Sequence, residues 1–165
     1  TSNTFALEKY FNWSGICIEP NKTVFNSLKN NRNSINLELA ASNKKGVCNF
    51  LSDTIVEGYG VQVNCDTLDN ILEENKSPHV IDYISLDVEG HEFQILENFP
   101  FDKWDIKSLT IEHNLYRDGP EKKDKIFELL KDRFNRVVED AVCCDPHPSV
   151  FNKPYEDWYI NKNLI

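Results

Sequence analysis

A strongly apolar segment that runs directly into a group of acids decides how this chain folds. Residues 80–92 read VIDYISLDVEGHE. Apart from Asp82 and Ser85, the residues from Val80 to Leu86 are apolar or aromatic, which is typical of a parallel strand buried on both faces. We therefore predict a central strand that ends where Asp87 begins a cluster of ionisable side chains.

Strands and helices alternate outward from this segment. Short apolar runs predict further strands at residues 15–19, 35–41 and 106–111. Apolar residues at helical spacing predict helices at residues 4–11, after Asn21, at residues 66–76, after Glu92 (with Phe93 and Leu96 inward) and from Gly119 through a stripe that reaches Phe134. This order predicts an α/β fold with a doubly wound, mostly parallel sheet, whose ligands bind beyond the carboxyl ends of the strands.

The remaining β-like segments are predicted at a sheet edge or in an insertion. Residues 46–51 and 60–64 flank a polar, glycine-bearing stretch, and we predict a hairpin or lid there. Residues 136–143 and 155–161 close the chain with only a loop between them, so at least one of these strands should run antiparallel at an edge.

Polar residues mark the expected starts of three helices. Thr4 with the two residues before it, Asn21 and Asp66 each precede a segment of helical spacing. A side-chain oxygen at such a position can cap the first backbone N–H groups of the helix. At the end of the helix after Asn21, Arg32 is predicted to face water.

The length and composition of the chain exclude several classes of protein. A chain of 165 residues can bury one core, so residues 1–165 are predicted to form a single domain. The formal net charge of −9 removes the electrostatic attraction that drives binding to nucleic acid or to anionic membranes. No apolar run approaches the roughly 20 residues that a membrane span needs. Because the five cysteines are odd in number and two are adjacent, we expect a reducing cytoplasm rather than a disulfide framework.

Acidic side chains follow three of the predicted strands. Glu19, Asp87 and Glu112 each lie where a strand ends, and the carboxyl ends of parallel strands meet at one edge of a sheet. A carboxylate in the position of Glu19 can accept both hydroxyls of a ribose. The simpler interpretation of Glu19 is a solvated acid that ends a strand.

The segment after the central strand concentrates the groups that could carry chemistry. Asp87 and Glu89 lie on the same side of an extended chain, and Gly90 permits a sharp turn. Paired carboxylates can hold a divalent cation, orient an ammonium or sulfonium group, or divide acid and base roles; the alternative is a polar helix start. His113 follows Glu112, which could tune it as a base, and a structural histidine is the alternative.

The sequence also resembles a known family. The segments that carry the resemblance are residues 2–9, 13–21, 82–92, 111–114 and 157–160, with DVEGHE at residues 87–92 the most specific. Together they resemble the FkbM family of S-adenosylmethionine-dependent methyltransferases. The resemblance implies a three-layer, doubly wound, Rossmann-like class I methyltransferase sheet, mostly parallel with an antiparallel C-terminal strand. It also implies S-adenosylmethionine as cofactor and methyl transfer to a hydroxyl on a sugar or small natural product.

The resemblance implies roles for individual residues. Glu19 would hold the cofactor ribose, and the end of the strand at Ser42 would lie near the adenine. Asp87 and Glu89 would face the sulfonium and the acceptor, with His113 as the base. The implied cofactor-binding set is Ser2, Asn3, Thr4, Glu19, Asn21, Ser42 and Asp87, and the implied catalytic set, without a metal ion, is Asp87, Glu89 and His113.

One element of the family pattern is missing from the sequence. A strand and a glycine-bearing loop normally precede the Ser-Asn-Thr segment at residues 2–4, whereas this sequence starts at Thr1 and contains no methionine. We therefore expect a fold that lacks its usual first strand, as a fragment of a longer gene would, and a weakened activity.

Two other functions fit the same residues. One is a non-catalytic α/β domain that binds a protein or forms a homodimer through an exposed sheet edge. The other is a metal-dependent hydrolase that uses Asp87, Glu89 and His113. For the methyltransferase, the expected partner is a small-molecule or glycan hydroxyl acceptor, with no nucleic acid and no membrane, and the acceptor pocket is expected from residues 52–64 and 143–155.

Overall fold

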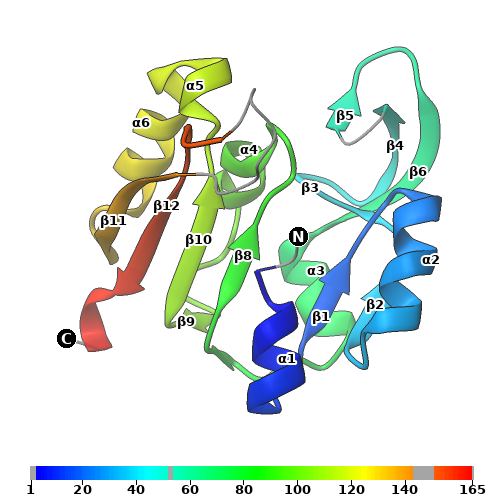
Figure 1. The fold of residues 1–165 in the computed structure, drawn as a ribbon, viewed down its shortest axis with the longest axis horizontal. Helices are drawn as coiled ribbons and strands as arrows, with labels where there is room; N and C mark the ends of the chain where they lie inside the picture. Colours follow the sequence, from blue (N-terminus) through cyan, green and yellow to red (C-terminus); the bar gives the residue numbers. More distant parts are fainter. Residues whose placement is uncertain (1–2, 52–53, 143–150, 165) are drawn as a thin grey trace. The chain divides into compact units, whose positions relative to one another are not determined.

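The computed structural model, drawn as a ribbon in Figure 1, describes residues 3–51, 54–142 and 151–164. The chain divides into two compact units. The first unit is Thr1–Ile71 and the second is Leu72–Ile165. Within the described ranges, none of the helices is both long and apolar enough to cross a membrane. The single domain over residues 1–165 stays a prediction.

The first unit combines a parallel strand pair with a mixed sheet. Its elements are α1 (Phe5–Phe11), β1 (Ile16–Ile18), α2 (Lys22–Asn31), β2 (Ile35–Leu37), β3 (Ala40–Ser42), β4 (Gly46–Leu51), β5 (Thr54–Val56), β6 (Val61–Thr67) and the start of α3 (Leu68–Glu74). Strand β1 pairs in parallel with β2. The second sheet has the order β3-β6-β4-β5, with β3 parallel to β6 and the other pairs antiparallel.

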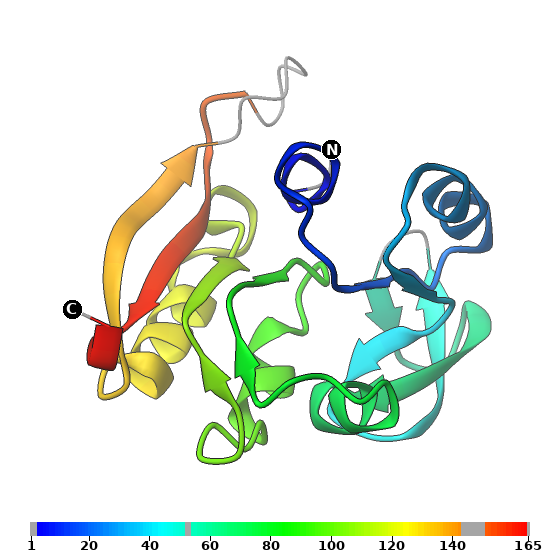
Figure 2. The same cartoon turned by 90° about the horizontal axis from the view of Figure 1, so that it is seen from below.

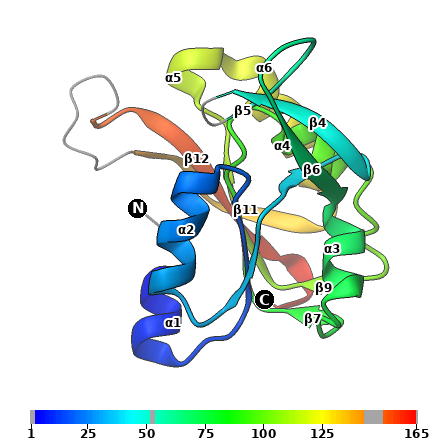
Figure 3. The ribbon, with the colours of Figure 1, turned by 90° about the vertical axis from the view of Figure 1, so that its right-hand side faces the viewer.

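The predicted hairpin is confirmed, and the predicted strand at residues 35–41 is wrong in one respect. Strands β4 and β6 lie side by side as an antiparallel pair (Figure 3). The segment at residues 35–41 divides into β2 and β3, which pair with different partners. Ala40, Cys48 and Cys65 form the buried cluster of the second sheet. A switch of partner between two sheets leaves no local mark on an apolar run, so periodicity alone misses it.

Of the three predicted helix caps, only Asn21 is confirmed. Its side-chain oxygen accepts from the backbone N–H groups of Thr23 at 3.0 Å and Val24 at 3.2 Å. Thr4 occupies the N-cap of α1, but its side chain makes no capping hydrogen bond.

At the third helix the cap is displaced by one residue. Strand β6 continues through Thr67, and the Thr67 hydroxyl, not Asp66, accepts from the backbone N–H of Asn70 at 3.2 Å. Asp66 instead accepts from the Asn70 side-chain amide at 2.9 Å. The helix starts later than predicted because the strand pairing with β3 extends to Thr67.

The prediction that Arg32 faces water is wrong. Its side chain is 4% exposed, and its Nε lies 2.7 Å from Oε2 of Glu8. Its Nη2 donates to the Thr4 hydroxyl at 3.0 Å. Because the partner carboxylate comes from a helix 24 positions earlier, the local pattern of α2 could not reveal the burial.

Gly60, directly before β6, needs the conformational freedom of glycine. Its φ is +101°, and a Cβ there would meet the Phe50 carbonyl oxygen at 2.7 Å. We expect Gly60→Ala to destabilise the protein by about 1–3 kcal/mol, since both the backbone and the close approach would be strained. Thermal unfolding checks this against Gly15→Ala, where a Cβ would meet nothing within 4 Å. Equal losses in the two variants would contradict the prediction.

The second unit is built on a mixed four-stranded sheet with the order β11-β12-β10-β8. Its elements are β7 (Val80–Ile81), β8 (Ile84–Leu86), α4 (Glu92–Glu97), β9 (Asp105–Ile106), β10 (Ser108–Glu112), α5 (Leu115–Asp118), α6 (Pro120–Leu130), β11 (Phe134–Val142), β12 (Pro154–Asn161) and the short 3₁₀-helix η1 (Lys162–Leu164). Strands β8 and β10 are parallel. Strand β12 runs antiparallel to both β10 and β11 (Figure 2), which confirms the predicted antiparallel strand near the end of the chain.

The central apolar segment is not one continuous strand. Strands β7 and β8 are separated at Asp82 and Tyr83, and β9 and β10 are separated at Lys107. The Asp82 carbonyl accepts from the Ser108 hydroxyl at 2.7 Å, and its carboxylate pairs with the Lys107 ammonium at 2.7 Å. The Lys107 backbone N–H also donates to the Ile81 carbonyl at 2.9 Å, so these side-chain contacts add to the backbone pairing at the break. The prediction of a parallel strand in this segment is confirmed, because β7 pairs in parallel with β9 and β8 with β10.

Apolar residues of the helices and the sheet form the core of this unit. The most deeply buried, each at most 3% exposed, are Ile95, Leu96, Trp104, Ile106, Leu109, Ile111, Ile126, Leu130, Phe134 and Tyr159. Leu96 faces inward as predicted, but Ile95 rather than the half-buried Phe93 is its buried neighbour. Phe134 belongs to β11 and not to the helical stripe. This core holds the ends of β8 and β10 beside each other.

Candidate functional site

Two carboxyl groups meet where the parallel strands β8 and β10 end. Leu86 pairs with Ile111 in the register of these strands, so Asp87 and Glu112 follow as the next residues of each. Carboxylate oxygens of Asp87, Glu112 and Glu92 all lie within 4.8 Å of one another. The sheet register therefore brings together the acids that the sequence placed at two separate strand ends.

Glu112 is held in its acid form at neutral pH. The residue is 6% exposed, and its Oε2 has no hydrogen-bond partner within the described parts of the chain. Burial, the charges of Asp87, Glu89 and Glu92, and a hydrogen bond with Asp87 raise the pKa of Glu112 to about 9.

Asp87 is the acceptor of this pair. The partial burial of its carboxylate raises its pKa, as do the charges of Glu89, Glu92 and Glu156, while the hydrogen bond with Glu112 lowers it. The residue as a whole remains exposed. Asp87 and Glu112 thus share one proton between a buried carboxyl and a carboxylate that is open to a ligand.

Glu92 fixes the loop that carries Asp87. Its Oε1 accepts from the backbone N–H groups of Val88 and Gly90, each at 3.1 Å, and its Oε2 accepts from the Lys122 ammonium at 3.2 Å. The residue has no exposed surface. Because these bonds fold the loop back onto the start of α4, Glu92 positions Asp87.

Glu89 has a strained backbone at the tip of this loop. Its φ of 53° lies in the left-handed region, which is uncommon for a residue with a side chain. Its Oε2 accepts from Nη1 of Arg117 at 2.8 Å, which comes from α5. The charge of Glu89 acts on Asp87, but the Glu89 carboxylate itself is paired with an arginine. Its predicted role beside Asp87 stays a prediction.

His113 lies apart from these acids in a buried polar cluster. Its Nε2 is 3.2 Å from Oδ1 of Asp157 and 3.6 Å from Oδ1 of Asp140, and its Nδ1 accepts from the backbone N–H of Leu115 at 3.1 Å. Neighbouring residues of a strand face opposite sides, so His113 points away from the face that Glu112 uses. This geometry is that of a structural histidine, and it does not support the predicted role as a base.

The remaining predicted site residues belong to the first unit. Glu19 is half-buried directly after β1, its Oε1 accepts from the Asn21 backbone N–H at 2.7 Å, and its pKa is raised by burial against the effect of that bond. Ser42 is buried at the end of β3. Asn3 and Thr4 precede α1, and Ser2 lies outside the described residues. A half-buried carboxylate after a strand suits a ribose diol, but the cofactor roles of these residues stay predictions.

Asn114 was part of the family resemblance in the sequence, but it was given no role in the site. Asn114 is 2% exposed with a left-handed φ of 48°, and its Nδ2 donor has no partner among the described residues. Glu112 was predicted as an acid at a strand end and as a neighbour that tunes His113, without a role of its own in the site. In the sequence, Glu112 and Asn114 are recognisable as polar residues at the end of a buried strand. Only the folded sheet shows that a polar atom of each is buried without a hydrogen-bond partner.

No metal centre is assigned to the described part of the chain. The carboxylates of Asp87, Glu92 and Glu112 are close, but both oxygens of Glu92 are already bonded and the Lys122 ammonium stands where a cation would be attracted. In the second cluster, both nitrogens of His113 are in use. Asp87, Glu89 and His113 are not brought into one ligand set, so the metal-dependent hydrolase gains no support. The acceptor segments at residues 52–53 and 143–150 lie outside the described residues.

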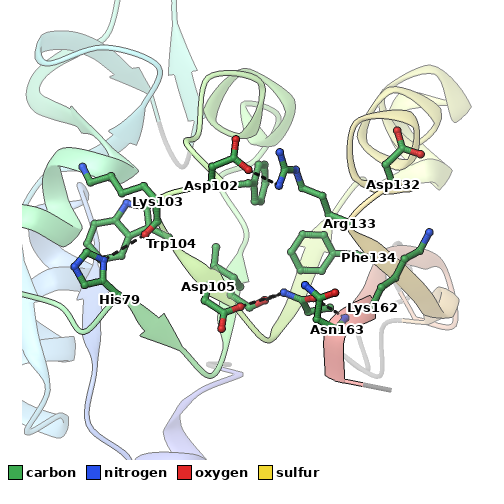
Figure 4. A pocket seen from close by; sticks show the side chains of 13 residues that line it. His79, Asp102, Lys103, Trp104, Asp105, Asp132, Arg133, Phe134, Lys162 and Asn163 are labelled. Carbon is green, nitrogen blue, oxygen red and sulfur yellow. Dashed lines mark hydrogen bonds and ion pairs between the residues drawn. The ribbon is translucent and has the colours of Figure 1, made fainter.

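A separate cavity of about 540 Å³ lies at the opposite end of the strands, where β10 begins and β12 ends (Figure 4). Two of its acids are bonded to other residues of the wall. Arg133 pairs with Asp102 at 2.7 Å, and the Asn161 amide donates to Asp105 at 3.3 Å. None of the residues predicted to act on a substrate lines it.

Comparison with known proteins identifies the family of the chain. The profile of the methyltransferase FkbM domain matches residues 1–137 of the chain. No curated protein and no solved structure matches the chain significantly. The matched region includes β8, β10 and the loop with Asp87, Glu89 and Glu92. The chain therefore belongs to the FkbM methyltransferase family.

Proposed function

We propose that this chain is an S-adenosylmethionine-dependent methyltransferase that methylates a hydroxyl group on a sugar or small natural product. The observation that carries the proposal is the Asp87–Glu112 pair, which places a carboxylate at the ends of two parallel strands. Membership of the family supports methyl transfer, and a carboxylate in this position suits an acceptor that must lose a proton.

The residues present fit the cofactor in their chemistry. Glu19, half-buried after β1, is suited to the ribose hydroxyls, and Ser42, at the end of β3, is our candidate neighbour of the adenine. When bound, S-adenosylmethionine supplies an electrophilic methyl group. Asp87 orients the acceptor hydroxyl and takes its proton, and Glu92 holds the Asp87 loop in place through Val88 and Gly90.

The proposal also includes the detailed topology of the fold, the class of the acceptor and the location of the protein. We infer a three-layer, doubly wound, Rossmann-like class I arrangement and a small-molecule or glycan acceptor, without nucleic acid or membrane partners. Three of the cysteines, Cys17, Cys48 and Cys65, are free thiols, which supports a reducing cytoplasm. A homodimer through a sheet edge stays a prediction that sedimentation at several concentrations would test.

Calorimetric titration of the 165-residue chain with S-adenosylmethionine and S-adenosylhomocysteine tests the proposal. We expect binding of both, and we expect Glu19→Gln to weaken it by about tenfold, since a lost pair of hydrogen bonds to a charged group costs about 1.5–3 kcal/mol. The matched control is Glu38→Gln, an exposed carboxylate that pairs with Lys22.

The titrations test cofactor binding and the ribose role of Glu19 separately. Absence of binding in the wild-type chain would contradict the cofactor assignment for this polypeptide. Equal binding by Glu19→Gln and wild type would reject the ribose role alone. Low-micromolar binding would remove the expectation of a weakened activity.

A further inference from the structure

Trp158 is an exposed aromatic residue on a strand that has neighbours on both sides. Strand β12 lies between β11 and β10, and Trp158 pairs with Thr110 of β10 and with Val138 of β11. Trp158 is nevertheless 42% exposed, whereas Tyr159 next to it is 1% exposed in the core. A large ring that stays open to solvent on an inner strand is a candidate contact for a ligand.

A hydrogen bond holds the indole of Trp158 in one orientation. Its Nε1–H donates to Oε1 of the buried Glu156 at 2.7 Å. Because this N–H is the only donor of the indole, the ring offers a ligand its flat apolar face and no hydrogen bond. A side chain that is already fixed loses little conformational freedom when a ligand packs on it.

The face of the sheet that carries Trp158 also carries carboxylates of the proposed site. Glu156 pairs with Glu112 in the register of β12 and β10, and two residues further along β12, Trp158 pairs with Thr110. Residues that pair across strands point to the same face, and so do residues two apart, so these four side chains share one face. At the end of this face, carboxylate oxygens of Glu112 and the exposed Asp87 lie within 4.8 Å of each other.

A second aromatic residue adjoins the same face. The hydroxyl of the half-buried Tyr83 lies 2.7 Å from the Thr110 hydroxyl. Ser85 of β8 is the register partner of Thr110, so a further hydroxyl group lies on this face. The surface beside the carboxylates therefore combines aromatic rings with hydroxyl groups.

We infer that Trp158 is a stacking platform for a sugar ring, and that the methylated hydroxyl belongs to a pyranose that packs on its indole. This inference rests on the proposed function and narrows its acceptor to a sugar. A pyranose has a face of C–H bonds, which packs on the electron-rich face of an indole, and a rim of hydroxyl groups, which donate to carboxylates. Trp158 would bind the ring, and its rim would reach Asp87.

The spacing along the sheet suits a ligand of this size. Trp158 lies two residues before the register position of Glu112, which is about 7 Å along the strands. A single sugar ring with its hydroxyl groups bridges such a distance. A flat aromatic alcohol could also pack on the indole, but it has one hydroxyl group and would turn C–H bonds toward the carboxylates. The neighbouring hydroxyl groups of a pyranose can donate to several carboxylate oxygens together.

Saturation-transfer NMR with the full chain tests the platform. The probes are the methyl α-pyranosides of glucose, galactose and mannose, with benzyl alcohol as the flat alternative. We expect at least one pyranoside to bind and to receive saturation mainly through the C–H protons of one ring face. Absence of binding by all three, or tighter binding of benzyl alcohol than of each of them, would overturn the inference.

Variants of Trp158 test whether the indole itself makes the contact. We expect Trp158→Leu to weaken pyranoside binding about tenfold, since aromatic residues contribute strongly to binding sites, and Trp158→Phe to restore most of it through its flat ring. The matched control is Trp13→Leu in the first unit, because Trp13 is 41% exposed. Equal losses in Trp13→Leu and Trp158→Leu would overturn the inference, and thermal unfolding shows whether each variant is folded.

A measurement on the wild type keeps the test independent of the variants. With nitrogen-15 in the indoles, the pyranoside that binds is expected to shift the Nε1–H signal of Trp158 and to leave those of Trp13 and the buried Trp104 in place. An unmoved Trp158 signal would overturn the inference even if S-adenosylmethionine binds. Failure of the proposed function would instead appear as absence of S-adenosylmethionine binding in the calorimeter, with the sugar-induced shift of Trp158 retained.

Discussion

Replacing Asp157 with alanine is expected to destabilise the protein by about 3–5 kcal/mol, as removal of one member of a buried ion pair does. Asp157 has no exposed surface and accepts from four groups. They are His113 Nε2 at 3.2 Å, Arg136 Nη1 at 3.1 Å, the Asp140 backbone N–H at 2.8 Å and the Tyr159 hydroxyl at 3.3 Å. Without the carboxylate, the buried donors of His113 and Tyr159 lose their acceptor.

Urea unfolding measures the loss. The matched control is Asp124→Ala on the exposed face of α6, for which a change within about 0.5 kcal/mol is expected. Asp157→Asn should cost less than Asp157→Ala, because the amide oxygen still accepts. A loss below about 1 kcal/mol in Asp157→Ala would contradict the view that this residue holds β11, β12 and the end of β10 together.

The same carboxylate predicts how stability depends on pH. Burial alone would raise the pKa of Asp157, but the hydrogen bonds from His113, Asp140 and Arg136 lower it to about 2. Its unfolded value is about 3.8. A lowered pKa stabilises the folded state above the unfolded value, and this stabilisation is lost as the pH falls toward 2. The wild type should therefore lose about 2 kcal/mol over this range that Asp157→Asn does not lose.

The second large effect is expected at Glu8 in the first unit. Its side chain pairs with the buried guanidinium of Arg32, and it accepts from the Asn33 backbone N–H at 2.6 Å and from the Ser34 hydroxyl. The hydrogen bond from Ser34, opposed by burial and joined by the bonds from Asn33 and Arg32, lowers the pKa of Glu8 to about 2. We expect Glu8→Ala to cost about 3 kcal/mol, since Arg32 would stay buried without its carboxylate.

A double-mutant cycle isolates this pair. Glu8→Ala combined with Arg32→Met removes both charges, and we expect the double variant to be more stable than Glu8→Ala alone. The free energy of unfolding of the four proteins gives the coupling between the residues. Additive losses would show that Glu8 acts through Asn33 and Ser34 rather than through Arg32.

Local patterns were sufficient where the determining interactions are local. Asn21 caps α2 because its side chain reaches N–H groups two and three residues ahead. Pro120 starts α6 because a missing N–H costs nothing in the first turn. The acidic segment after β8 was identified in the same way, from the order of residues within a single strand and turn.

Local patterns failed where the partner is distant in the sequence. Arg32 was predicted to be exposed, but Glu8 covers it from another helix. The apolar run at residues 35–41 divides into two strands because its halves pair with different partners. The run at residues 80–86 keeps one register along its neighbouring segment and is interrupted only at Asp82 and Tyr83. For His113 the sequence left a base and a structural histidine open, and strand alternation, which turns it toward Asp157 while Glu112 faces Asp87, favours the structural histidine.

The sequence by itself determined the alternation of strands and helices, the acids at the strand ends and the resemblance to the FkbM family, because these depend on the order of neighbouring residues. Only the tertiary structure decided which acids meet and which of them keeps a proton. Register places Asp87 beside Glu112, and burial among like charges raises the pKa of Glu112 to about 9. Both effects arise between residues 25 positions apart, which no pattern within one segment can contain.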